Sequence, residues 1–157
     1  MSCPAAPTAP NASRFAALPP ERAKLWESFP ALERVFFPSF VGLQLEEVRE
    51  GYARMRLPYR PELDQPVGVL HGGAIATLID TVVVPAIGSV YPDRQRLLTI
   101  DMQVQYLGPV AKQDAVAEGW VEKRGRTLCF CRAEVRIASG ELVATGTLVY
   151  GVRPPVE

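Results

Sequence analysis

The sequence contains few of the residues that build metal centres or disulfide frameworks. Its 157 residues include one histidine, His71, and three cysteines: Cys3, Cys129 and Cys131. No two cysteines have CxxC spacing, and their number is odd. Structural zinc sites and disulfide scaffolds need clusters of these residues. We therefore expect reduced thiols, a cytoplasmic location and no metal site.

A surplus of charge of either sign is also absent. Lys plus Arg and Asp plus Glu each number 17, so the formal net charge is zero. Because nucleic acids and anionic membranes attract basic proteins, we expect neither as a partner. A local basic cluster could still bind one phosphorylated ligand.

A comfortable transmembrane segment is missing as well. The most apolar stretch, residues 72–90 (GGAIATLIDTVVVPAIGSV), is short for a membrane span and contains Asp80 and Pro85. A helix that is apolar on nearly every side is a buried helix. Residues 1–20 are rich in proline and hold no apolar run that could serve as a signal peptide. We predict that they form a disordered or extended arm.

The remaining segments predict an α+β domain over residues 21–157. An amphipathic helix is expected at residues 21–36, bent near Pro30. Strands are expected at residues 40–49, 51–59, 96–106, 113–124, 127–138 and 141–151, from alternating apolar residues and Gly-containing turns. We therefore predict an antiparallel sheet of about six strands around one long buried helix.

Asp80 is the main candidate for chemistry. A lone carboxylate in an apolar helix is costly unless it is paired, protonated or placed at a solvated cleft. Asp80 is therefore either a structural carboxylate or the acting group of a site. His71-Gly72-Gly73 begins the same helix, where free amides can bind developing negative charge on an oxygen, although such a motif also fits an ordinary helix cap.

The spacing between these two features suggests a shared site. Gly72 and Asp80 are eight residues apart on one helix, a rise of about 12 Å. This is too far for both to act on one carbonyl group. If both serve one site, they come from two subunits of a symmetric dimer.

Three segments together resemble a known family. Residues 65–73 (QPVGVLHGG) with Asp80, residues 99–109 (TIDMQVQYLGP) and residues 124–128 (RGRTL) are similar to the hotdog-fold thioesterases of the phenylacetate-pathway (PaaI-like) and 4-hydroxybenzoyl-CoA thioesterase type. The resemblance covers roughly residues 40–150. It implies a hotdog fold and hydrolysis of an aryl- or medium- to long-chain acyl-CoA to free acid and CoA, with no cofactor beyond the CoA of the substrate.

The resemblance also implies roles for single residues. Asp80 matches the catalytic carboxylate, acting as nucleophile or as general base toward water. Gly72 matches the backbone amide that polarises the thioester carbonyl, and Gln65 a polar side chain that places the thioester or the water. His71 matches the histidine near the thioester sulfur. Thr99 falls where some relatives carry a hydroxyl that orients the water.

The remaining expectations concern substrate binding and assembly. Gly73 and the basic turn of Lys123, Arg124 and Arg126 are candidates for contacts with CoA, although the turn also fits a solvated hairpin. The resemblance implies a homodimer or a dimer of dimers (a homotetramer). One subunit would supply Gln65, His71 and Gly72, and the other Asp80 and Thr99.

Two alternatives remain open at the level of sequence. One is a hotdog enoyl-CoA hydratase or dehydratase, which also pairs a histidine with a carboxylate. The D-x-x-x-x-H arrangement of such enzymes is missing, since Pro66 stands five residues before His71. The other is a non-catalytic acyl-CoA-binding protein. A panel of acyl-, enoyl- and hydroxyacyl-CoAs distinguishes the three.

Overall fold

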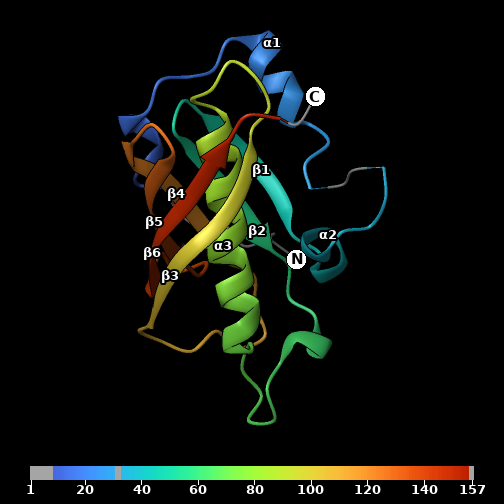
Figure 1. Cartoon of the computed structure of the whole chain (residues 1–157). Coiled ribbons are helices and arrows are strands. Elements are labelled where there is room, and N and C mark those ends of the chain that lie inside the picture. Colours follow the sequence, from blue (N-terminus) through green and yellow to red (C-terminus); the bar gives the residue numbers. More distant parts are fainter. Residues whose placement is uncertain (1–8, 31–32, 156–157) are drawn as a thin grey trace.

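One six-stranded antiparallel sheet wraps around one long helix, α3 (Gly72–Gly88), in the computed structural model, which describes residues 9–30 and 33–155 (Figure 1). The strand order across the sheet is β1-β2-β4-β5-β6-β3. The strands are β1 (Gln44–Arg49), β2 (Tyr52–Leu57), β3 (Arg96–Tyr106), β4 (Ala115–Arg124), β5 (Leu128–Arg136) and β6 (Leu142–Arg153). The α+β hotdog architecture expected from the sequence is confirmed.

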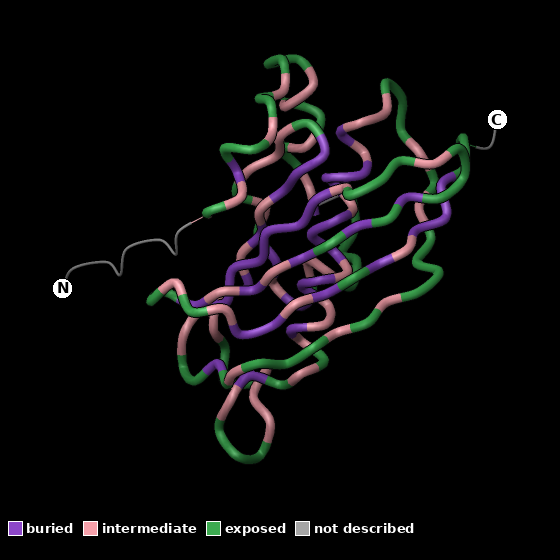
Figure 2. Tube along the Cα trace, turned by 90° about the vertical axis from the view of Figure 1, so that its left-hand side faces the viewer, coloured by how far each residue is buried: buried purple, intermediate pink, exposed green. Residues whose placement is uncertain are grey.

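Helix α3 lies where the sequence predicts it and is largely buried. Its N-cap is His71, whose Nδ1 accepts a hydrogen bond from the amide of Gly73 at 2.8 Å. Pro85 lies inside the helix, which continues to Gly88, so the missing amide of the proline does not end it. Figure 2 shows the buried residues gathered in the middle of the molecule.

Two glycines let the sheet approach α3 closely. A Cβ atom added to Gly119 on β4 would lie 2.7 Å from Cγ1 of Val82, and one added to Gly146 on β6 would lie 2.5 Å from Cγ2 of Ile79. Both distances are shorter than van der Waals contact. The absence of side chains at these positions therefore sets the distance between the sheet and the helix that carries Asp80.

The prediction of one helix over residues 21–36 is wrong. Only short turns form at the described positions, and Leu25 is 69% exposed, so few contacts stabilise a longer helix there. A second difference is a short helix at residues 37–41, which overlaps the start of the first expected strand. The short elements are η1 (Ala12–Arg14), α1 (Pro20–Ala23), η2 (Lys24–Trp26), α2 (Phe37–Val41) and η3 (Pro61–Leu63).

The described part of the N-terminal arm lies against the face of the sheet that points away from α3. Ala12 packs with Tyr52 and Trp120 in a small apolar cluster. Next to this cluster, the buried carboxylate of Glu118 accepts three hydrogen bonds. They come from the backbone amide of Asn11 (3.0 Å), the side-chain amide of Asn11 (3.2 Å) and the hydroxyl of Tyr52 (2.9 Å). These donors offset the cost of burying a charge. Residues 1–8, and Cys3 with them, lie outside the described residues.

The two described cysteines belong to the core. Cys129 and Cys131 are free thiols on β5 and are both buried. Burial raises the pKa of Cys131 well above its ordinary value, which opposes a nucleophilic role. Within residues 9–30 and 33–155, no helix is long and apolar enough to cross a membrane.

Candidate active site

Asp80 lies at the centre of a hydrogen-bonded cluster formed by α3, β3 and β6. Its Oδ1 atom accepts a hydrogen bond from Oγ1 of Thr99 at 3.0 Å and one from the hydroxyl of Tyr150 at 2.6 Å. The Tyr150 hydroxyl also lies 2.8 Å from the backbone oxygen of Asp80. Thr99 and Tyr150 are partners across the β3–β6 ladder, so the two donors reach the helix from neighbouring strands.

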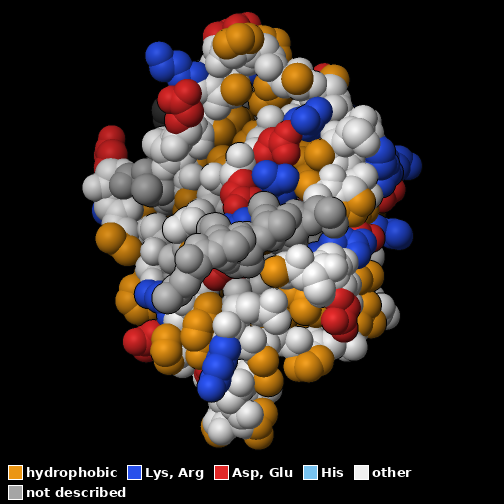
Figure 3. Space-filling view, turned by 180° about the vertical axis from the view of Figure 1, so that it is seen from behind, with side chains coloured by type: hydrophobic (Ala, Val, Ile, Leu, Met, Phe, Trp, Pro, Cys, Tyr) orange, Lys and Arg blue, Asp and Glu red, His pale blue; other side chains and the backbone are white. Residues whose placement is uncertain are grey.

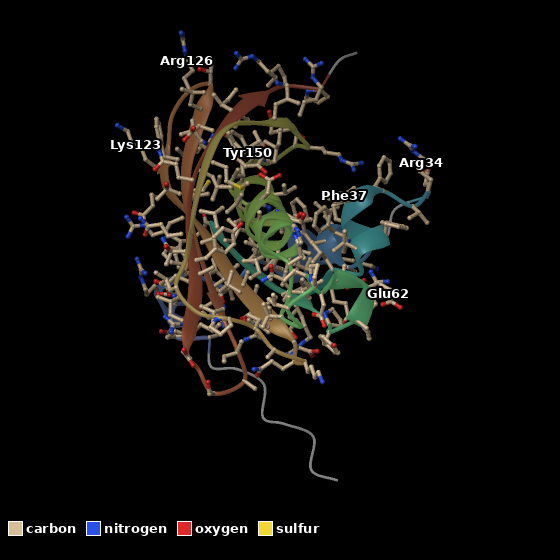
Figure 4. All side chains as sticks on the ribbon, turned by 90° about the horizontal axis from the view of Figure 1, so that it is seen from below. Arg34, Phe37, Glu62, Lys123, Arg126 and Tyr150 are labelled. Carbon is tan, nitrogen blue, oxygen red and sulfur yellow. The ribbon has the colours of Figure 1, made fainter. Side chains whose placement is uncertain are left out.

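Tyr150 is the member of this cluster that the sequence analysis missed. It is only 3% exposed, and burial together with the nearby Asp80 carboxylate raises its pKa above the ordinary tyrosine value. The phenol therefore keeps its proton at neutral pH and acts as a donor. Figure 4 shows Tyr150 between the sheet and the helix. Tyr150 lies near the end of a strand with alternating apolar residues, and this pattern does not indicate a contact with Asp80.

A second cluster forms at the start of α3. The Nδ1 atom of His71 is occupied by the amide of Gly73, so in the neutral imidazole Nε2 carries the proton. The amide of Gly72 donates no hydrogen bond within the described residues. The carbonyl oxygen of Gly72 accepts one from the hydroxyl of Tyr106 on β3 at 2.9 Å. Gly72 therefore offers a free first-turn amide, as an oxyanion donor requires.

Gln65 lies in the loop that leads to this cluster. Its amide donates to the oxygen of Val69 at 2.8 Å, and its own carbonyl accepts from Gly68 at 2.9 Å. This turn returns the chain toward α3, where the amide of His71 donates to Leu63 at 2.8 Å. The loop thus holds Gln65 and His71 at the same end of the helix.

A cavity of about 380 Å³ opens beside the second cluster. Two exposed phenylalanines of α2, Phe37 and Phe40, form one wall, and Figure 4 shows Phe37 on the side of the helix away from the sheet. The cavity is mostly apolar and is therefore suited to an acyl group. Its lining comprises Phe37, Phe40, Val41, Glu62, Leu63, Asp64, His71, Gly73, Ala74 and Thr77.

The expected site residues thus fall into two groups within one copy of the chain. Asp80 and Thr99 are in contact, and Gln65, His71, Gly72 and Gly73 lie around the helix start. Helical geometry separates Gly72 from Asp80 by about 12 Å. One copy therefore does not bring the free amide to the carboxylate.

The three basic residues at the turn between β4 and β5 differ in their contacts. Arg124 donates to the oxygen of Val90 at 2.7 Å, and its guanidinium lies 4.1 Å from the ring centre of Tyr91, so it contacts the segment that directly follows α3. Lys123 at the end of β4 and Arg126 in the following turn are exposed, and both extend away from α3 in Figure 4. These two remain free to contact phosphates. On the face shown in Figure 3, acidic and basic side chains lie next to one another.

Comparison with known proteins places the chain in a family. The family model of the thioesterase superfamily matches residues 67–144. A candidate esterase of Saccharolobus solfataricus is 30% identical over 118 residues, which are 75% of this chain and 82% of that protein. The chain belongs to the thioesterase superfamily. The matched region includes every expected site residue except Gln65, and the expected class of enzyme, a thioester hydrolase, is confirmed.

Other relatives agree with this membership of the thioesterase superfamily. A candidate esterase of Halobacterium salinarum is 38% identical over 57% of this chain and 62% of that protein. Human acyl-coenzyme A thioesterase 13 is 33% identical over 51% of this chain. The match spans 58% of the human protein, less than two thirds of its length. A solved Haemophilus influenzae thioesterase has the same fold, with a TM-score of 0.72, 22% identity and coverage of 76% of this chain and 84% of that one.

Proposed function

We propose that the protein hydrolyses an aryl- or medium- to long-chain acyl-CoA to the free acid and CoA, at a site shared by two copies of the chain. Asp80 is the catalytic carboxylate, and the amide of Gly72 from the other copy binds the thioester oxygen. The observation that carries the proposal is the free amide of Gly72 at the start of the helix that also carries Asp80. A human acyl-CoA thioesterase among the relatives supports CoA as the leaving group.

The chemistry follows from the two clusters. The Gly72 amide stabilises the negative charge that develops on the carbonyl oxygen during attack. Asp80 either attacks the carbonyl carbon, so that the thiolate of CoA leaves and water hydrolyses the resulting acyl-aspartyl anhydride, or takes a proton from a water that attacks the carbonyl directly as the thiolate leaves. Gln65 places the thioester or the water, and His71 donates from Nε2 toward the departing sulfur. Lys123 and Arg126 are the exposed cations proposed to contact the CoA phosphates.

The edge strand β3 supports a two-fold partner. Among the residues that the structure describes, β3 pairs only with β6, and it exposes Leu98 (68%) and Ile100 (63%). Such an edge is a template for pairing with another strand. Along β3, Thr99 contacts Asp80 of α3, and Tyr106 contacts Gly72 at the start of the same helix.

The register of that pairing follows from these contacts. An antiparallel pair of β3 strands related by a two-fold axis near Met102 and Gln103 brings Thr99 of one copy close to Tyr106 of the second copy. The carboxylate of one copy then faces the helix start of the other, twice per dimer. Each of the two sites then contains the Asp80 carboxylate of one copy and the Gly72 amide of the other. Dimers of this kind could pair again into a tetramer.

The first experiment measures steady-state hydrolysis of a panel of aryl- and fatty-acyl-CoAs. Asp80→Asn should lower kcat by roughly 10²- to 10⁴-fold, as expected for loss of an acid–base group. Asp93→Asn, in an exposed loop, is the matched control and should keep wild-type rates. Equal rates for Asp80→Asn and wild type would refute the role of Asp80. Turnover of enoyl-CoA instead would favour a hydratase, and binding without turnover a binding protein.

The second experiment tests Gly72. Proline is favoured at the first helical position and lacks the amide hydrogen, and the extended backbone of His71 (φ −63°, ψ 136°) suits a residue before proline. Gly72→Pro should therefore lower kcat while α3 still forms. Gly72→Ala is the control, because it adds a comparable contact with the Tyr106 ring but keeps the amide. Equal losses in both variants would argue against an oxyanion role.

The third experiment tests whether the site is shared. Asp80→Asn and Gly72→Pro should each have strongly reduced activity as homodimers. A purified mixed dimer of the two variants contains one site with both defects and one intact site, so activity should return to about half the wild-type value if the sites are shared. Lack of recovery in a stable mixed dimer, or a monomer by light scattering at micromolar concentration, would contradict the shared site.

A further inference from the structure

Tyr150 places a buried hydroxyl against the proposed catalytic carboxylate. The residue lies on β6 and is 3% exposed. Its hydroxyl is 2.6 Å from Oδ1 of Asp80 and 2.8 Å from the backbone oxygen of the same residue. A phenol has one proton to donate. The shorter distance and the charge of the carboxylate favour Oδ1 as the acceptor.

The two oxygens of Asp80 are not equivalent. Oδ1 accepts from both Thr99 and Tyr150, whereas Oδ2 accepts no hydrogen bond from any described residue. Two donors that come from different strands fix the plane of the carboxylate as well as its position. The oxygen that remains free to react is therefore Oδ2.

Neutral donors hold Asp80 without cancelling its charge. Within residues 9–30 and 33–155, no arginine or lysine forms an ion pair with Asp80. Besides burial, the side chains that influence the pKa of Tyr150 are Asp80, Thr99 and the buried Cys131. Hydroxyl groups orient a carboxylate, whereas a bound cation would also stabilise its charge strongly. The cluster thus suits a carboxylate that must stay reactive.

We propose that Tyr150 is a positioning residue, which together with Thr99 binds Oδ1 of Asp80 so that Oδ2 faces the water or the thioester. This inference rests on the proposed role of Asp80. It also gives Thr99 a different contact from the one expected by resemblance. The Thr99 hydroxyl binds the carboxylate directly, so its effect on the water passes through Asp80.

The test replaces Tyr150 with Phe, which removes the hydroxyl and keeps the ring in the core. We expect kcat for the best acyl-CoA to fall by about 10- to 100-fold, as for a small misplacement of a reacting group, with KM changed less than about twofold. Tyr91→Phe is the matched control. It removes a hydroxyl that lies 3.6 Å from Sγ of Cys129 and does not touch Asp80, so kcat should be unchanged.

A double-mutant cycle separates positioning from a general structural role. If Tyr150 acts through Asp80, adding Tyr150→Phe to Asp80→Asn should cause no further loss of the residual rate. An equal loss in both backgrounds would overturn the proposal, as would wild-type kcat in Tyr150→Phe alone. Either result leaves the role of Asp80 intact, because that role depends on Asp80→Asn alone.

Thr99 provides a test that does not depend on the folding of the Tyr150 variant. Thr99→Val removes the other donor to Oδ1 at nearly constant shape, and Thr99→Ser restores it. We expect kcat to fall in Thr99→Val and to recover in Thr99→Ser, with KM similar in both. Wild-type kcat in Thr99→Val would show that the orientation of Oδ1 does not matter, which would overturn the proposal.

Discussion

The contact between Gly146 and Ile79 offers a quantitative test of how the sheet positions the helix. A Cβ atom at position 146 would lie 2.5 Å from Cγ2 of Ile79, the residue before Asp80. Because Gly146 and Ile79 are buried between the sheet and α3, the chain must move to accept the methyl group. Overpacking of this kind costs about 1–3 kcal/mol. We expect Gly146→Ala to lower Tm by about 2–4 °C for each kcal/mol lost.

A compensating variant sharpens this prediction. Ile79→Ala alone leaves a cavity and should cost about 2–5 kcal/mol. In the double variant, the new methyl group of residue 146 occupies part of the space that the isoleucine leaves. The loss of stability should therefore be smaller than the sum of the two single losses by about 1 kcal/mol or more.

The assay is urea unfolding followed by tryptophan fluorescence at one fixed protein concentration. Gly108→Ala is the control, since the nearest atom to its added Cβ is a side-chain oxygen of Glu141 at 3.3 Å, which can move away. It should change stability by less than about 1 kcal/mol. Strict additivity of Gly146→Ala and Ile79→Ala would refute the argument that this contact sets the distance between helix and sheet.

Three further predictions concern the arm, the basic turn and alkaline pH. Asn11→Ala removes the side-chain donor to the buried Glu118 carboxylate, while the backbone amide of residue 11 remains, and should cost about 1–3 kcal/mol in urea unfolding; a change under about 0.3 kcal/mol would refute our account of the arm. Arg124→Ala should lower Tm with little change in KM for acyl-CoA, whereas Arg126→Ala should raise KM and leave Tm unchanged; the reverse pattern contradicts the division of the turn. Burial and the nearby Glu118 raise the pKa of Tyr52 in the folded state above its value of about 10 in the unfolded chain. The protonated phenol therefore stabilises the fold below a pH of about 10, and this stabilisation is lost as the pH rises above that value. Chemical denaturation between pH 8 and 11 should show this loss, reduced in Tyr52→Phe.

The long elements could be predicted from the sequence because their patterns extend over many residues. The stretch after His71 is apolar on nearly every side, and it forms the buried helix Gly72–Gly88. The strand expected at residues 96–106 has the same bounds as β3. In both segments local preference and burial favour the same structure, so the sequence is sufficient.

The N-terminal third could not be predicted in the same way. The apolar residues at 25–36 have helical spacing, but a helix needs a surface on which to bury its apolar face. Leu25, Val35 and Phe37 are instead more than 60% exposed in the structure. The docking of Asn11 on Glu118 joins residues 107 positions apart. Contacts over such separations leave no periodic pattern in a single sequence.

The candidate site was predictable only in part, because its register depends on a bulge. The β3–β6 ladder pairs Thr99 with Tyr150 and Asp101 with Val149, and its register shifts at Ile100, the extra residue between them. In a regular strand, residues two positions apart point to the same face. With the bulge, Thr99 reaches Asp80, and Asp101 instead lines a hollow on the outer face of the sheet with Phe130 and Thr147.

This irregularity matters for the chemistry as well as for the fold. If Ile100 were paired regularly instead of forming the bulge, Thr99 and Asp101 would share a face. Either a second carboxylate would then stand near Asp80 on the inner face, or the Thr99 hydroxyl would leave Asp80 for the outer one. Two nearby carboxylates raise the cost of ionising both, and loss of the hydroxyl would leave Oδ1 with Tyr150 alone as a donor among the described residues. The bulge avoids both outcomes, so the expected role of Thr99 depends on the residue that follows it.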